Sequence, residues 1–137
     1  QNSGIPSNWI TALVSDNEGK IWIGTEFGLT VFDGNSWVTY DKSNSAIPSL
    51  DIRDLAVDAA NNIWIGTTEG LVKFDREKWQ IFGLSKSGHP LRRDYKIHID
   101  ISGNKWMLSS NFWHMTRNYR DGLSIFNENG VKFNFAK

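Results

Sequence analysis

Apolar and polar residues alternate along this chain in short runs, and each run ends at residues that favour turns. Alternation with a period of two predicts β-strands that bury one face. In the first 40 residues the runs predict strands at 9–15, 20–25, 29–32 and 36–40. Gly and Asn stand in the turns between them and tolerate a positive φ. No stretch keeps a helical period, so the pattern predicts an all-β fold.

The same pattern returns after a step of 42 residues, so that 5–40 is repeated at 47–82. Both units begin with Ile-Pro-Ser and contain Ile-Trp-Ile-Gly-Thr followed by Gly-Leu and Phe-Asp. A third unit keeps the step as far as Trp106 and then departs from it at Leu108. It rejoins the pattern at Gly122, ten residues late. The chain is therefore predicted to be a repeat protein with an insertion in its third unit.

Four short antiparallel strands in about 42 residues are typical of one β-propeller blade. We predict a single domain over 1–137 with blades at about 5–42, 47–84 and 91–135, the third containing an inserted loop at 109–121. Three four-stranded antiparallel blades are half of a six-bladed ring, which a second chain would complete.

The repeated letters resemble the two-component regulator propeller repeat, from Ile5-Pro6-Ser7-Asn8 through Ile21-Trp22-Ile23-Gly24-Thr25 to Phe32-Asp33. The resemblance implies a propeller of the kind found in the periplasmic sensor region of hybrid histidine kinases, many of which are thought to respond to oligosaccharides. Kinase activity is not implied for this chain, because the sequence contains no kinase segment and only three repeats.

The residues that recur in all three units are predicted to serve the architecture. The large aromatic side chain at one strand position is expected to pack between neighbouring sheets rather than to stack on a ligand; it is Trp22, Trp64 and Trp106. The acidic residue that begins a tight turn is expected to accept backbone N–H bonds; it is Asp16, Asp58 and Asp100. A calcium site is the alternative, but each loop offers too few carboxylates.

Composition narrows the function classes. Fifteen basic and fifteen acidic side chains give no net charge that would attract nucleic acid or an anionic membrane. There is no Cys and no apolar run of membrane-spanning length. The start at Gln1 suits a mature end left by removal of a signal peptide, and equally a cut made for expression. We therefore predict a periplasmic or secreted protein with no membrane insertion.

A search for chemistry gives little. The three His residues, at 89, 98 and 114, lack metal-ligand spacing, and no Ser lies in a Gly-x-Ser-x-Gly motif. Asp51 and Asp54 flank Arg53, which favours an ion-paired surface over a catalytic pair. The sequence predicts a non-enzyme with no catalytic residues, cofactor or metal. A lyase or hydrolase built on loops is the less favoured alternative, with His114 as its first candidate.

A ligand site is predicted at the loops of the third unit that differ most from the other two units. The insertion and the loop before that unit's first strand are expected on one face of the blade, and they contain aromatic, Arg and His residues that suit recognition of an oligosaccharide or a similar small polar ligand. The predicted ligand-binding residues are Arg92, Arg93, Tyr95, Trp113, His114, Arg117, Tyr119 and Arg120. Two alternatives stay open: a structural plug or subunit contact, and a module that binds another protein.

Charge is divided unevenly along the chain. Residues 1–83 have six basic and eleven acidic side chains, a net −5, whereas 84–120 have seven and two, a net +5. A homodimer that sets blade 1 of one chain against blade 3 of the other would use this difference. A trimer and a larger native chain that supplies the missing blades are the alternatives.

Overall fold

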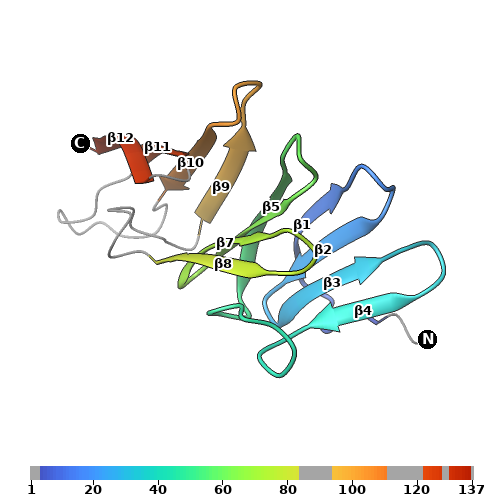
Figure 1. Cartoon of the computed structure of the whole chain (residues 1–137). Coiled ribbons are helices and arrows are strands. Elements are labelled where there is room, and N and C mark those ends of the chain that lie inside the picture. The colour runs from blue at the N-terminus through green and yellow to red at the C-terminus, as the bar shows by residue number, and fades with distance from the viewer. Residues whose placement is uncertain (1–3, 84–93, 111–121, 128–129, 137) are drawn as a thin grey trace.

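A computed structural model of the chain describes residues 4–83, 94–110, 122–127 and 130–136. These residues form three separate sheets, each of four antiparallel strands that follow one another in chain order. Figure 1 shows the sheets standing side by side, with no helix in the described part of the chain. The predicted all-β architecture of propeller blades is confirmed.

The strand bounds follow the alternating runs. Blade 1 consists of β1 (Ile10–Ser15), β2 (Ile21–Thr25), β3 (Gly28–Phe32) and β4 (Trp37–Tyr40). Blade 2 consists of β5 (Ile52–Val57), β6 (Ile63–Thr67), β7 (Gly70–Phe74) and β8 (Trp79–Gly83). Blade 3 consists of β9 (Asp94–Ile99), β10 (Lys105–Ser110), β11 (Gly122–Asn127) and β12 (Gly130–Ala136). Every strand of blade 1 begins within one residue of its predicted start.

The turns are closed by short local hydrogen bonds. After β1, the Asp16 N–H donates to the Lys20 carbonyl at 2.9 Å. After β2, the Thr25 hydroxyl donates to the Gly28 carbonyl at 3.0 Å and its oxygen accepts the Phe27 N–H. The second unit repeats this hairpin bond from Thr67. Because each turn satisfies its own polar groups, the same residues form the same hairpin in both units.

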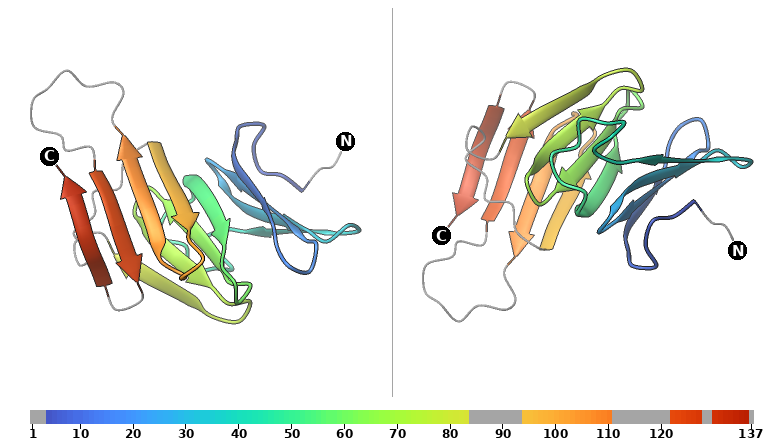
Figure 2. Two further views of the ribbon diagram at one scale, coloured as in Figure 1. Left: turned by 90° about the horizontal axis from the view of Figure 1, so that it is seen from above. Right: turned by 90° about the horizontal axis from the view of Figure 1, so that it is seen from below.

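The blades are arranged around the first strand of each sheet. β1 packs beside β5, and β5 packs beside β9. The two views in Figure 2 show the remaining strands of each sheet running outward from these inner strands. The turns that follow β1, β5 and β9 all lie at the upper end of Figure 1. The opposite end, where the chain enters each first strand, is called here the loop end.

Two hydrophobic seams join the blades. The first seam, between blades 1 and 2, buries Trp22, Leu29, Val31, Ile47, Ile52, Leu55, Ile63, Ile65, Val72 and Phe74. The second seam, between blades 2 and 3, buries Trp64, Leu71, Ile97 and Met107. Strand β6 serves both seams, because successive side chains of a strand point to opposite faces. Each large apolar side chain removed from water contributes about 1.5–3 kcal/mol.

Trp106 departs from the predicted role. It stands at the strand position of Trp22 and Trp64, but its side of blade 3 meets no other blade among the described residues, and it is only half-buried. The prediction that all three Trp residues pack between sheets is therefore right for two of them. The described blades have two seams and two open faces, one on blade 1 and one on blade 3.

Candidate functional site

Most of the predicted ligand-binding residues lie outside the described part of the chain. These are Arg92, Arg93, Trp113, His114, Arg117, Tyr119 and Arg120. Tyr95 lies in β9, where its backbone pairs with Ser109. The assignment of these eight residues to a ligand site stays a prediction.

The points where the two predicted loops leave the sheet lie together. Segment 84–93 leads into Asp94 and segment 111–121 follows Ser110, and these two residues pair across β9 and β10. The segment 111–121 returns to the sheet at Gly122, which pairs with Ser109. All of these anchor residues are therefore at the loop end of blade 3.

A hollow of about 550 Å³ lies at the loop end of blade 1. It is lined by Ser7, Asn8, Trp9, Ile10 and Glu26. Trp9 is 71 % exposed, and Phe27, which follows the lining residue Glu26 in the β2–β3 turn, is 58 % exposed. The Ser7 hydroxyl donates to the Glu26 carboxylate at 3.4 Å. An exposed Trp ring next to hydroxyl, amide and carboxylate groups forms a surface on which a polar ligand with an apolar face can stack.

Sequence reasoning missed this hollow. The repeat contained a signal for it, because blade 2 has Asp51 and Glu69 where blade 1 has Trp9 and Phe27. The fold does not require an aromatic side chain at these exposed positions, because the second unit has acidic residues there. Residues 9 and 27 differ between the two units, whereas the predicted roles rested on residues that the units share.

The loop end of blade 2 is charged. Asp51 and Arg53 form an ion pair, as the sequence predicted. Asp54 points elsewhere: its carboxylate accepts the Ile97 N–H of β9 at 2.7 Å. The two carboxylates are thus engaged separately, one with a cation and one with the neighbouring blade.

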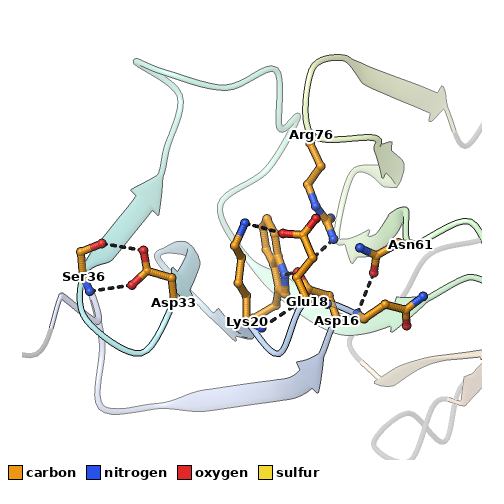
Figure 3. Close-up of polar contacts among 9 residues, drawn as sticks. Asp16, Glu18, Lys20, Asp33, Ser36, Asn61 and Arg76 are labelled. Carbon is orange, nitrogen blue, oxygen red and sulfur yellow. Dashed lines mark hydrogen bonds and ion pairs between the residues drawn. The ribbon is translucent and has the colours of Figure 1, made fainter.

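A polar cluster crosses the first seam at the opposite end (Figure 3). The Asp16 carboxylate accepts the Trp22 indole N–H at 2.9 Å and an Arg76 N–H at 2.9 Å. The Arg76 guanidinium also lies 5.1 Å from the centre of the Trp22 ring, within cation–π range. Burial alone would raise the pKa of the Asp16 carboxyl, but the bonds from Trp22 and from backbone N–H groups hold it below its ordinary value. Arg76 thereby clamps blade 2 onto blade 1.

The second seam has the same cluster with a different cation. The Trp64 indole donates to Asp58 at 2.8 Å, and the Lys105 ammonium lies 4.4 Å from the Trp64 ring centre. Burial would raise the pKa of the Asp58 carboxyl, whereas the hydrogen bonds from Trp64 and Asn62 and the charge of Lys105 lower it.

Blade 3 repeats the acidic half of this cluster on its open face. The Trp106 indole donates to Asp100 at 2.8 Å. That bond, together with bonds from Asn104 and Ser102, lowers the pKa of the Asp100 carboxyl to about 2. The predicted backbone bonds to the turn aspartates are confirmed in all three units: Asp16 and Asp100 accept the N–H groups of Glu18 and Ser102, and Asp58 accepts that of Asn62. The indole bond was missed, although a spacing of six between Asp and Trp is visible in every unit.

A smaller groove of about 250 Å³ lies in the first seam beside Arg76. The rings of Trp22, Tyr40 and Phe74 and the charged groups of Lys20, Asp33 and Arg76 are among its lining. Trp22 and Tyr40 are stacked with ring centres 6.1 Å apart. This groove has the mixed aromatic and charged lining of a ligand site, and it lies away from the predicted loops.

Neither a metal cluster nor a membrane helix is found in the described residues. Over 4–83 and the described parts of blade 3, no three His, Cys, Asp or Glu side chains gather closely enough to hold a metal ion. In the same residues, no helix is long and apolar enough to cross a bilayer.

The repeat units match a known family. Residues 4–27 and 46–69 match the family model described as two component regulator propeller. Two of the three units therefore match the two-component regulator propeller repeat. The third unit is outside the matched residues, in line with its departure from the pattern at Leu108. No curated protein matches the chain in sequence.

Solved structures share the propeller fold. The extracellular domain of the putative hybrid two component system BT3049 from B. thetaiotaomicron is 21 % identical, with a TM-score of 0.74 over 99 % of this chain and 18 % of that one. Streptogramin B lyase is 16 % identical, with a TM-score of 0.68 over 98 % and 42 %. PorZ of Porphyromonas gingivalis is 22 % identical, with a TM-score of 0.64 over 88 % and 17 %. The propeller chain therefore spans less than half the length of each of these structures.

Proposed function

We propose that this propeller chain is a non-catalytic, extracytoplasmic binding module of the sensor type, and that it recognises a small polar ligand such as an oligosaccharide at its loop end. Its repeats and its likeness to an extracellular domain of a two component system support a periplasmic or secreted setting. The observation that carries the ligand is the exposed ring of Trp9 in the polar hollow of blade 1, with a second exposed ring, Phe27, in the adjoining β2–β3 turn.

We propose that the predicted blade 3 residues belong to the same site. The anchor residues of the blade 3 segments are at the same end of the molecule as Trp9, and these segments contain the predicted Trp113 and Arg117. An aromatic ring stacks on the C–H face of a sugar, while Arg and Asn groups bond to its hydroxyls. The inner strands β1, β5 and β9 hold the three loop ends next to one another, as a shared site requires.

The test is a thermal-shift screen of the whole chain against neutral and acidic oligosaccharides. A ligand that binds the folded state raises the melting temperature by mass action, by several degrees when its concentration is about 100 times the Kd. Replacing Trp9 or Trp113 by Ala should remove the shift. The matched control is Ile101→Ala, a fully exposed residue at the opposite end, which should preserve the shift. Equal shifts in all variants would rule out the loop end as the site.

The lyase-fold relative makes a loop-built enzyme the second candidate. Streptogramin B lyase shares the fold at 16 % identity. His114 is the residue on which such an activity would depend. If a substrate is found, His114→Ala should abolish turnover while the thermal shift is preserved, and a loss of both would support binding alone.

A further inference from the structure

The carboxylate of Glu26, at the loop end of blade 1, has no cation beside it among the described residues. Glu26 is half-buried and lines the hollow together with the exposed ring of Trp9. In the described part of the chain it forms no ion pair, and only the Ser7 hydroxyl donates to it, at 3.4 Å. A carboxylate that is partly withdrawn from water is stabilised by a cation or by hydrogen-bond donors. The residues of the hollow supply little of either.

A Ser hydroxyl builds the same local frame at the loop ends of blades 1 and 2. In blade 1 the Ser7 oxygen accepts the Trp9 N–H at 3.0 Å, while the hydroxyl bonds to Glu26. In blade 2 the oxygen of the corresponding Ser accepts the Asp51 N–H at 3.2 Å and is hydrogen-bonded to the Thr68 hydroxyl at 2.8 Å. The two loop ends can therefore be compared side chain by side chain.

The two loop ends differ in how their charges are paired. In blade 2 the acid is Asp51, and Arg53, two residues on, forms its ion pair. In blade 1 the acid is Glu26 instead. Thr11 stands at the position of Arg53, and its hydroxyl donates to the Ile52 carbonyl of the neighbouring blade at 2.6 Å. Blade 2 thus neutralises its own carboxylate, whereas blade 1 presents a carboxylate and a ring, and none of its described residues supplies the cation.

These loop-end positions stay open in a blade that has neighbours on both sides. Blade 2 packs against blade 1 and blade 3, yet the Asp51 side chain is 28 % exposed. In the same blade Thr68 is half-buried and Glu69 is exposed. The corresponding Trp9, Glu26 and Phe27 are therefore accessible by their place in the fold, whichever blade stands next to blade 1.

We infer that the sugar unit that stacks on Trp9 carries a free ammonium group, which pairs with the Glu26 carboxylate. This inference rests on the proposed function, because it names the ligand class of the same hollow. A carboxylate beside a Trp ring attracts an ammonium through its opposite charge and through the negative face of the ring. The hydroxyls of the same sugar can bond to Ser7 and Asn8, which also line the hollow.

The charge of Glu26 separates this ligand class from two others. An acidic sugar would bring a like charge against the carboxylate. An N-acetylated sugar would present a neutral amide in place of the cation. The ligand class is therefore an oligosaccharide of amino sugars whose amines are not acetylated.

The test compares matched probes on the whole chain. The tetramers of glucose, N-acetylglucosamine and glucosamine, with the same linkage, carry a hydroxyl, an amide and an ammonium on the same ring carbon. Titration calorimetry at mildly acidic pH and low salt, where the amine is protonated, gives the three Kd values. We expect the glucosamine tetramer to bind about fivefold or more tightly than the other two. Added salt should reduce this preference, because it screens the ion pair.

Two variants assign the preference to the hollow. Glu26→Gln keeps the shape of the side chain and removes its charge, so it should abolish the preference for the amine while the tetramers still bind. Glu69→Gln removes an exposed acid from the loop end of blade 2 and should leave the preference unchanged. This control excludes an effect of net charge.

The outcomes separate the inference from the proposed function. Equal Kd values for the three tetramers, with binding that Trp9→Ala abolishes, would overturn the inference and leave the proposed function in place. A preference for the amine that persists in Glu26→Gln would overturn the inference as well. If the glucosamine tetramer does not bind, the inference is wrong, and the oligosaccharide screen decides the proposed function separately. If Trp9→Ala leaves all binding unchanged, both are overturned.

Discussion

Each of the two seams places a cation beside a buried Trp ring, but the cation comes from a different residue and a different element. In the first, Arg76 reaches Asp16 and Trp22 from the turn between β7 and β8. In the second, Lys105 reaches the ring of Trp64 from within β10. The first cation stands at a position where blade 1 has Gly34, and both residues have a positive φ, 84° for Arg76 and 96° for Gly34.

The difference shows what each seam needs. Both have a cation beside an indole whose N–H is bound to a carboxylate, but that cation comes from a turn in the first seam and from a strand in the second. A positive φ is unfavourable for a residue with a side chain, by about 1 kcal/mol. The Asp-Trp pair is thus the fixed half of the seam and the cation is the variable half.

The largest expected effect separates seam from open face. Trp64→Ala removes a fully buried ring and should lower the free energy of unfolding by about 3–5 kcal/mol. Trp106→Ala, on the open face of blade 3, should cost about 1 kcal/mol. Urea unfolding of the two variants measures the contrast, and equal losses would mean that Trp106 is covered in solution.

The next effect concerns the cation. Arg76→Met leaves the buried Asp16 carboxylate without its ion-pair partner and should cost about 2–3 kcal/mol. Lys78→Met, an exposed residue two positions on, is the matched control and should stay within about 0.5 kcal/mol. A loss as small as that of the control would show that the indole and backbone bonds suffice for Asp16.

A smaller effect tests the close approach at the seam glycine. Gly24→Ala forces Ile52 or the strand to shift and should cost about 1–2 kcal/mol. Leu108→Ala, the corresponding position on the open face, should cost less than about 1 kcal/mol. Thermal unfolding of both variants gives the comparison.

The smallest effect is on pH dependence. The pKa values of Asp16, Asp58 and Asp100 are lowered in the folded chain, so the stability they provide is present above the ordinary value of 3.8 and is lost as the pH falls toward 2. Asp58→Asn should flatten the acid limb of a plot of unfolding free energy against pH. Glu77→Gln, an exposed residue, is the control and should leave the limb unchanged.

The fold could be predicted because its signals are local. The alternating runs, the Gly-containing turns and the 42-residue step each depend on residues close in sequence, and Asp16 and Thr25 satisfy their own turns. The seam contacts could not be predicted, since Arg76 and Asp16 are 60 residues apart and only the packing of two blades brings them together. Trp9 was not predicted for a different reason. It stands where the second unit has Asp51, and the predictions used the residues that the units share.

The segments that lead into the blades have a consequence for the ancestry of such chains. Pro6 lies against Gly28, and in the next unit Pro48 lies against Gly70, so each unit folds its own beginning onto its own hairpin. Recombination between gene copies just ahead of Ile5 or Ile47 would therefore insert or delete one whole blade and sever none of these contacts. Lineages built from this unit can change their number of blades in single genetic steps.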